Sequence, residues 1–363
     1  MIEIKIPWWQ TSFDNGEDIA AAHAINSRHI SQGVLTKKFE GELAKFLGVP
    51  EVIATSSGTS AITLALMGVN LKPGDEVLIP NRTWIATAHA VQILGAVPVF
   101  VDTEMDLPIM QLSELDKFIT PLTKAIIPVH MNGRSVDMKT LNNYASERGL
   151  VVIEDAAQSF GSKDLEGNFL GTLSSAGCFS LSVAKIISTG QGGFIATHDL
   201  DLARRLRNLR THGVENTTEP EKWIVPGFNF RFTDVLASIG IVQLGLMEER
   251  AKKAREIYNY YCSGLLSLEK CKVIPVREFE LGPYVEVLVE NRREFREHLE
   301  LNGIETRPFY PDLNSAPYWK FRNNRELFNS MKFAKKGVYL PSGPSITLQQ
   351  VDSVIASIHH FFS

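Results

Sequence analysis

The sequence has few cysteines and lacks the segments that mark secreted or membrane proteins. Its three cysteines, Cys178, Cys262 and Cys271, are odd in number and widely spaced, which argues against a disulfide framework and against a zinc site. The first residues show no basic region followed by an apolar core, so we expect no signal peptide. No apolar run reaches the roughly 18 residues that a membrane span needs. We therefore expect a cytoplasmic protein.

An excess of charge of either sign is also absent. The formal net charge is −4, which gives no electrostatic reason to expect binding to nucleic acid or to an acidic membrane. One local basic cluster exists, at Arg204, Arg205, Arg207 and Arg210. Its spacing is helical, so a solvated helix face explains it better than a binding patch.

The 363 residues are 44% hydrophobic and 21% charged, which allows a sizeable core and, at roughly 150 residues each, about two domains. Up to about residue 240, nearly continuous apolar runs alternate with helical patterns, which predicts an α/β domain with a mostly parallel sheet. A long charged helix, Gln243–Cys262, then opens a smaller α+β region. We predict a large domain over residues 1–240 and a small C-terminal domain over residues 241–363.

The large domain is predicted to hold seven strands connected by helices. The strands are Val52–Thr55, Glu76–Pro80, Val97–Val101, Ala125–Val129, Val151–Glu154, Gly177–Ser180 and Gly193–Ala196. The helices are Ser60–Met67, Ile85–Leu94, Met138–Arg148 and Leu202–Arg210. In the small domain we predict the strands Cys271–Pro275 and Tyr284–Leu288 and the helices Arg292–Asn302 and Leu348–Phe362.

Lys185 lies between an apolar strand and a glycine-rich turn. Among Ala184, Ile186 and Ile187 its amine would be poorly solvated, and desolvation lowers the pKa of a lysine and favours the neutral nucleophile. Such a lysine can form an imine with an aldehyde cofactor. A snorkelling lysine beside a glycine-rich hairpin explains this run about equally well.

Another apolar strand ends in two carboxylates, Glu154 and Asp155, at the position where α/β sheets present their site residues. A buried Asp155 needs a cationic partner, because an unpaired buried charge costs several kcal/mol. A protonated pyridine nitrogen would serve, and the ion pair would keep the ring an electron sink. Capping of a following helix at Ala156–Ala157 is the alternative, and for this motif alone it is the simpler one.

Two further strand ends carry groups that suit a flat, phosphorylated ligand. In Ser56–Ala61 a strand turns into a helix through small hydroxyl residues and Gly58, and helix N-termini bind anions. Trp84 could stack on a flat ring. A capped helix without a ligand and a core tryptophan are the alternatives. Taken together, these features point to pyridoxal phosphate. They supply a lysine that can form an imine, a carboxylate that can pair with a ring nitrogen, a helix N-terminus that can bind a phosphate and an aromatic side chain that can stack on a ring.

From about Ile30 to the C-terminus, the chain resembles the sugar aminotransferases often named after DegT, DnrJ and StrS, a branch of the fold-type-I pyridoxal-phosphate enzymes. The motifs that carry the resemblance are Ser57–Ala61, Gly74–Val77, Glu154–Gln158, Phe179–Ser180 with Lys185, Thr189–Gly193, Gly227–Asp234 and Gly303–Pro311. Branches that deoxygenate sugars carry histidine where this chain has Lys185, so the resemblance favours transamination. The stretch Ile186–Gln191 departs from the usual asparagine-containing version, but no implied role falls on it.

The resemblance implies a role for particular positions. The cofactor contacts are Lys185 as Schiff-base lysine and proton shuttle, Asp155 on the pyridine nitrogen, Gln158 on the ring's 3-oxygen, Trp84 on the ring face, and Gly58, Thr59 and Ser180 on the phosphate. Asn229 would reach the phosphate of the neighbouring subunit's cofactor, which implies a homodimer with shared active sites. The expected substrate contacts are His212, Arg231, Arg307 and Tyr310.

The implied reaction has two halves. An amino acid, with L-glutamate expected, leaves its amino group on the cofactor as pyridoxamine phosphate, and a nucleotide-linked keto-deoxy-sugar then accepts it. Such products belong to amino-sugar biosynthesis for secondary metabolites or for cell surfaces, such as the O-antigen of lipopolysaccharide. Other possibilities are open: a cyclitol ketone or small keto-phosphate as acceptor, dehydration or decarboxylation with the same cofactor, and a non-catalytic regulatory protein. Arg134, which follows a strand, is either a substrate contact or a surface arginine.

Overall fold

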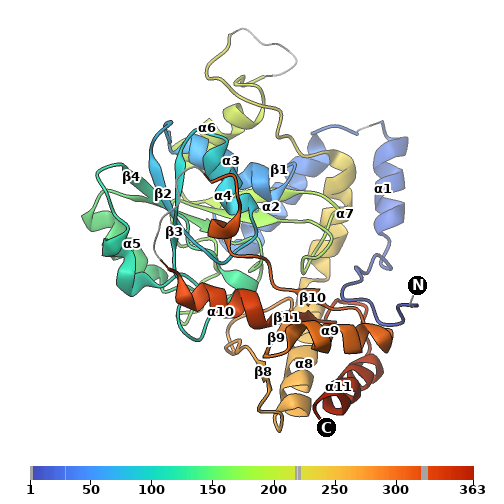
Figure 1. Ribbon diagram of the computed structural model, residues 1–363. Coiled ribbons are helices and arrows are strands. Elements are labelled where there is room, and N and C mark those ends of the chain that lie inside the picture. Colours follow the sequence, from blue (N-terminus) through green and yellow to red (C-terminus); the bar gives the residue numbers. More distant parts are fainter. Residues whose placement is uncertain (1–2, 29, 217–218, 220–221, 320–325) are drawn as a thin grey trace.

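The computed structural model describes residues 3–28, 30–216, 219, 222–319 and 326–363, and contains a seven-stranded and a four-stranded sheet (Figure 1). The large sheet has the strand order β1-β7-β6-β5-β4-β2-β3. Its strands are β1 (Glu51–Thr55), β2 (Glu76–Pro80), β3 (Val97–Val101), β4 (Thr123–Ile126), β5 (Val151–Asp155), β6 (Ala176–Ser180) and β7 (Gly193–Thr197). β7 is antiparallel to both neighbours, and the other neighbouring pairs are parallel. The predicted α/β class and mostly parallel seven-stranded sheet are confirmed.

Helices cover both faces of the large sheet, because successive side chains of each strand point to opposite faces and both sets are apolar. Ile53 and Ile195 belong to one core, which α3, α4, α5 and α6 complete. Ala54 and Phe194 belong to the other core, which α2 and α7 complete. The helices of this part are α1 (Glu17–Asn26), α2 (Val34–Leu47), α3 (Gly58–Gly68), α4 (Ala86–Gln92), α5 (Met138–Glu147), α6 (Leu200–Arg210) and α7 (Asp234–Gly245), with 3-10 turns η1 (Leu112–Lys117) and η2 (Met131–Gly133).

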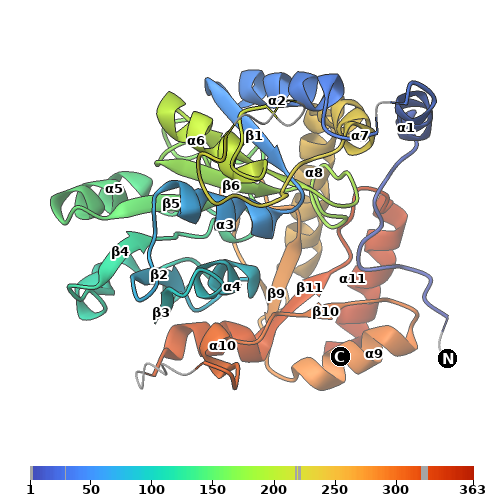
Figure 2. The ribbon, with the colours of Figure 1, turned by 90° about the horizontal axis from the view of Figure 1, so that it is seen from above.

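The second sheet is antiparallel and has the order β10-β11-β9-β8. Apolar side chains of α8, α9 and α11 bury one part of it, and the N-terminal residue Ile6 packs into the same cluster. Figure 2 shows the N-terminal segment passing this sheet on its way to α1. The elements are β8 (Cys271–Val273), β9 (Val285–Val289), β10 (Arg307–Pro308), β11 (Gly337–Leu340), α8 (Met247–Leu265), α9 (Arg292–Leu301), α10 (Phe328–Lys336), α11 (Leu348–Phe362) and the turn η3 (Leu313–Ser315). The division into domains at residues 240 and 241 stays a prediction, and that boundary falls inside α7.

The predicted long helix Gln243–Cys262 corresponds to α8 over most of its length, but its predicted start is wrong, because residues 243–245 belong to α7. α7 begins after Thr233, whose side chain accepts a hydrogen bond from the amide of Leu236, and it ends at Gly245. The backbone of Leu246 leaves helical geometry (φ −95°, ψ 3°) before α8 begins. A glycine weakens a helix interior, which makes Gly245 a suitable place for the break.

The arginine cluster of α6 is not the uniformly solvated face that its spacing predicts. Arg204 is exposed and pairs with Asp201, as expected. Arg210, however, is buried and donates to Glu40 at 2.6 Å and to the carbonyl oxygen of Ala54 at 2.9 Å. The prediction fails for Arg210 because this end of α6 packs between β1 and α2. Among the described residues, no helix combines the length and the apolar character that crossing a membrane requires.

Candidate active site

A cavity of about 630 Å³ lies where the parallel strands of the large sheet end, and the small sheet closes its other side. The loops after β1, β2, β5 and β6 all reach it, because the carboxyl ends of parallel strands lie along one edge of a sheet. Most of the predicted site residues line it together. These are Gly58, Thr59, Trp84, Asp155, Gln158, Ser180, Lys185, Arg307 and Tyr310.

Lys185 lies in an irregular turn between β6 and β7 and is half-buried. Loss of solvation lowers the pKa of its amine to about 8, and the negative charge of Asp155 opposes this shift only in part. The direction is the one that the sequence predicts. A lysine with this pKa is substantially neutral at mildly alkaline pH, so its amine can act as a nucleophile and as a base.

Asp155 ends β5 and is almost fully buried. Its carboxylate accepts a hydrogen bond from the Thr87 hydroxyl at 2.7 Å and another from the Ala157 amide at 3.1 Å. Burial raises the pKa of Asp155, while these two hydrogen bonds and the charge of Lys185 oppose that rise. No helix follows at Ala156, so the capping interpretation does not apply. Among the described residues, no side chain forms an ion pair with this carboxylate, so a cationic ligand group fits beside it.

The adjacent carboxylate, Glu154, has a different environment. It is fully buried and accepts hydrogen bonds from the His130 ring at 2.9 Å and from the amides of Gly171 and Leu173 at 2.7 and 2.8 Å. Its oxygens therefore join β5 to neighbouring loops. Of the two carboxylates at this strand end, only Asp155 lines the cavity.

Gln158 and Trp84 are placed as walls of the same cavity. The Gln158 side-chain oxygen accepts a hydrogen bond from the Asn132 amide at 3.0 Å, which orients the side chain and leaves its NH₂ group to donate to a ligand oxygen. Trp84 is 55% exposed and meets Tyr310 edge-on, with ring centroids 5.0 Å apart. This exposure excludes the core interpretation of Trp84 and makes its ring available for stacking.

The N-terminus of α3 forms an anion cradle at the wall of the cavity. Ser57 caps the helix by accepting from the amide of Ser60 at 3.0 Å, which leaves the amides of Gly58 and Thr59 without an acceptor inside the helix. A side chain at Gly58 would bring its Cβ within 2.9 Å of Ser180 Cβ, so glycine permits the close approach of α3 to β6. Amides and hydroxyls are what a phosphate group needs, and Asp155 is the only carboxylate among the described residues that line the cavity.

His212, Asn229 and Arg231 lie outside the cavity of their own chain. They belong to an arm, whose described residues are 211–216, 219 and 222–231, and which projects from the large sheet and joins α6 to α7 in the sequence (Figure 1). Asn229 is exposed and accepts a hydrogen bond from Arg231 at 2.9 Å, and His212 is also exposed. The arm nevertheless runs beside the cradle, since the Ser56 amide donates to the Phe230 carbonyl at 3.0 Å.

Both sequence interpretations of Arg134 are wrong. Its side chain is fully buried, forms an ion pair with Glu286 of β9 and donates to the carbonyl oxygen of Pro275 at 2.9 Å. It is neither at the surface nor in the cavity. The guanidinium instead ties the loop after β4 to the small sheet.

The sequence also missed several residues that line the cavity. Thr87 also lines the cavity and lies three residues after Trp84 in the same motif. Its hydroxyl, about one helical turn beyond Trp84, could have been recognised from the sequence as a further candidate. Trp8, Tyr284 and Tyr339 come from the N-terminal segment and the small sheet. Nothing in their local sequence could place them beside Lys185.

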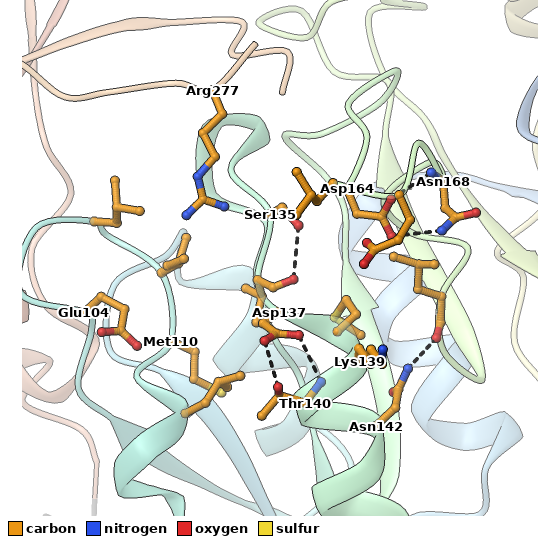
Figure 3. Close-up of a pocket in the computed structure, with 18 of the residues that line it drawn as sticks. Glu104, Met110, Ser135, Asp137, Lys139, Thr140, Asn142, Asp164, Asn168 and Arg277 are labelled. Atoms are coloured by element: carbon orange, nitrogen blue, oxygen red, sulfur yellow. Dashed lines mark hydrogen bonds between the residues drawn. The ribbon is translucent and has the colours of Figure 1, made fainter. Parts of the chain in front are cut away.

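A second hollow, of about 900 Å³, lies near the start of α5 (Figure 3). It contains none of the predicted site residues. Two of its carboxylates are engaged in local structure: Asp137 caps α5 by accepting from the Thr140 amide at 3.0 Å, and Asp164 accepts from the Asn168 amide at 2.8 Å. The cavity around Lys185 is therefore the candidate active site, although it is the smaller of the two.

Comparison with known proteins identifies the family of this chain. The model of the DegT/DnrJ/EryC1/StrS aminotransferase family matches residues 12–359. GDP-perosamine synthase of Escherichia coli O157:H7 is 33% identical over 363 residues, covering 99% of each chain. The dTDP-3-amino-3,4,6-trideoxy-alpha-D-glucose transaminase of Streptomyces venezuelae is 32% identical over 351 residues, covering 95% of this chain and 91% of that protein. The structure of NtdA from Bacillus subtilis with the bound cofactor PMP has a TM-score of 0.90 at 28% identity, covering 96% of this chain and 82% of the other.

Proposed function

Because this chain belongs to the DegT/DnrJ/EryC1/StrS aminotransferase family, we propose that it is a pyridoxal-phosphate-dependent aminotransferase acting on a nucleotide-linked keto-deoxy-sugar. The observation that carries the proposal is the pairing of Lys185, whose pKa is lowered to about 8, with a buried Asp155 that has no cationic side chain bonded to it among the described residues. Its role is amino-sugar biosynthesis. We place the protein in the reducing cytoplasm, because its three cysteines are free thiols.

The residues in the cavity fit the cofactor. Pyridoxal phosphate supplies an electron sink when it is bound. Asp155 would hold the ring nitrogen, and Gln158 would donate to the ring's 3-oxygen. Trp84 would cover the ring face, while the amides of Gly58 and Thr59 and the hydroxyl of Ser180 would hold the phosphate. The carboxylate at one end suits a pyridinium, and the hydrogen-bond donors at the N-terminus of α3 suit a phosphate.

Lys185 carries the proton transfers of the proposed reaction. Its Nζ would attach the cofactor and, once displaced by the donor amino acid, remove the proton from the α-carbon of that amino acid. In the second half-reaction the same nitrogen would return a proton to the carbon that receives the amine. L-Glutamate is the proposed donor. The hydrogen bonds from Thr87 and Ala157 favour the ionised form of Asp155 and so oppose the rise in its pKa that burial causes.

The acceptor would enter past Arg307 and Tyr310. Arg307 is exposed at the cavity mouth, pairs with Glu305 at 2.7 Å and lies over the Trp8 ring, so it offers a cation for a diphosphate. The buried Arg82 donates to the Tyr310 carbonyl oxygen and so holds the loop that carries Tyr310 in place. These contacts support a nucleotide-linked acceptor over a free sugar.

We further propose that the active form is a homodimer in which the arm of one subunit completes the site of the other. Asn229 is exposed, and the arm carries Trp223 and Phe228 with 75% and 51% of their surfaces exposed. Large apolar groups on a projecting segment are expected to be covered by a partner. In such a dimer Asn229 would reach the phosphate in the partner's cavity.

An absorbance spectrum of the protein with pyridoxal phosphate, recorded before and after excess glutamate and repeated for Lys185→Ala, tests the proposal. We expect a lysine-dependent band that glutamate converts, with release of 2-oxoglutarate. Keto-deoxy-sugars linked to GDP or dTDP should then restore the original band. Absence of any lysine-dependent band would overturn the cofactor assignment. Restoration by cyclitol ketones or small keto-phosphates alone would overturn the acceptor.

A further inference from the structure

The turn that carries Lys185 has no regular secondary structure, and groups from distant parts of the chain hold it in place. The carbonyl oxygen of Val183 accepts hydrogen bonds from the Trp9 indole at 2.8 Å and from the Thr11 hydroxyl at 2.6 Å. Both donors belong to the N-terminal segment, more than 170 positions earlier. One end of the turn is therefore fixed by this N-terminal strap, residues 8–12.

The next carbonyl oxygen, that of Ala184, accepts a hydrogen bond from the Tyr284 hydroxyl. The backbone of Tyr284 forms a reciprocal pair with the Asn132 side chain, donating and accepting at 2.9 Å. The Asn132 amide in turn donates to Gln158 at 3.0 Å. Tyr284 thus contacts the residue directly before Lys185 and, through Asn132, the residue that positions Gln158.

The strap and Tyr284 also support each other. Trp8 stacks on the Tyr284 ring with centroids 5.7 Å apart and an interplanar angle of 29°, and Trp9 meets the same ring edge-on at 5.5 Å. Further along the turn, the buried Arg250 donates to the carbonyl oxygen of Ile186 at 3.1 Å. Carbonyl oxygens on both sides of Lys185 are therefore held from outside the turn.

We propose that Tyr284, together with Trp9 and Thr11 of the strap, is a positioning residue that sets the location of the Lys185 amine through the Val183 and Ala184 carbonyls. This role rests on the proposed function of Lys185 as the proton carrier. A displacement of about 1 Å in a reacting group can lower a rate about 100-fold, so a turn without its own secondary structure needs such restraints. The network also couples the position of the amine to that of Gln158.

Tyr284→Phe is the decisive variant, because it keeps the ring that stacks on Trp8 and removes only the hydroxyl. The matched control is Tyr261→Phe: the Tyr261 hydroxyl is buried and donates to the carbonyl oxygen of Pro341 at 2.9 Å, away from the Lys185 turn. Both variants lose one hydrogen bond from a buried phenol to a backbone carbonyl. A role limited to stability predicts the same outcome for both.

Two measurements separate positioning from stability. In single turnover with glutamate, we expect Tyr284→Phe to lower the rate constant about 10-fold or more while the glutamate Kd changes less than about twofold. In cofactor-free protein, competitive labelling with acetic anhydride and mass spectrometry gives the pH midpoint of Lys185 reactivity. A loosened turn admits water to the amine, so this midpoint should rise in Tyr284→Phe and stay unchanged in Tyr261→Phe.

Thr11→Val removes one of the two donors to Val183 and should give a smaller effect in the same direction, which Thr11→Ser should restore. Equal rates and equal labelling midpoints for the Tyr284 and Tyr261 variants would overturn the proposal. The labelling experiment uses no cofactor, so it tests the positioning role independently of the proposed function. If the wild-type protein shows no lysine-dependent absorbance band, the proposed function is overturned, and the labelling result still decides the positioning role.

Discussion

Thr87 Oγ1 and Asp155 Oδ2 lie 2.7 Å apart in the buried wall of the cavity. The hydroxyl comes from the first turn of α4 and the carboxylate from the end of β5, so the hydrogen bond joins two residues that lie 68 positions apart in the sequence. It favours the ionised form of a carboxylate whose burial favours the neutral form. The protonation state of Asp155 therefore depends on a residue outside its own motif.

Thr87→Val should weaken cofactor binding, because it removes this hydrogen bond and raises the pKa of Asp155 further. A hydrogen bond to a charged group contributes about 1.5–3 kcal/mol, and since only the ionised carboxylate pairs with a pyridinium, losing this bond should lower the affinity by up to roughly 100-fold. The loss should grow as the pH falls, since the carboxylate is then protonated earlier. Titration of cofactor-free protein at pH 6 and pH 8 measures it. Thr87→Ser keeps the hydroxyl and should bind normally; equal affinities for the two variants would contradict the prediction.

The lowered pKa of Lys185 predicts a pH-dependent contribution to stability. The pKa is about 8 in the folded chain and 10.5 ordinarily, so between these values the unfolded chain binds more protons and stability rises with pH. At neutral pH, cofactor-free Lys185→Met should exceed the wild type in free energy of unfolding by up to about 3 kcal/mol, at ~1.4 kcal/mol per pKa unit. The difference should narrow as the pH rises from 8 to 10.5. Urea unfolding at several pH values checks this, and a constant difference would refute it.

Arg134→Met should destabilise the protein strongly, because it leaves the Glu286 carboxylate buried without its cation. Breaking a buried pair from one side costs about 3–5 kcal/mol. Adding Glu286→Gln should recover part of this loss, since the remaining partner is then neutral. Arg204→Met removes the exposed pair with Asp201 and should change the free energy of unfolding by less than about 1 kcal/mol. Urea unfolding of the four proteins tests the contrast, and similar losses for the two arginine variants would contradict it.

Mixing two inactive variants should restore activity if Asn229 acts in the partner's site. Lys185→Ala and Asn229→Ala, dissociated and reassociated together, should give about a quarter of wild-type turnover, because about half of the dimers are mixed and each mixed dimer has one complete site. The control mixes Lys185→Ala with Asp155→Ala, whose positions lie in the same cavity, and should stay inactive. No recovery in the first mixture would exclude the shared site.

The candidate site could be predicted from sequence to the extent that its residues follow strands. Gly58, Trp84, Asp155 and Lys185 each come after an apolar run, and parallel strands place their carboxyl ends along one edge. Nearly continuous apolar runs also reveal strands covered on both faces, which is why all seven strands of the large sheet were found. Such information is local, because it depends only on side-chain pattern within a few residues.

The remaining features depend on contacts between distant segments, and only the tertiary structure decided them. The strands β10 and β11 were not predicted, and β10 has only two residues, which is too few to show a periodicity. The sequence around Arg134 does not reveal that this residue is buried, because its partner Glu286 comes from the distant strand β9. In the same way, Tyr284 reaches the Lys185 turn only because the small sheet folds over the strand ends. The sequence by itself determined which groups could perform the chemistry, whereas folding determined which groups hold them, since those partners are chosen by packing in three dimensions and leave no local pattern.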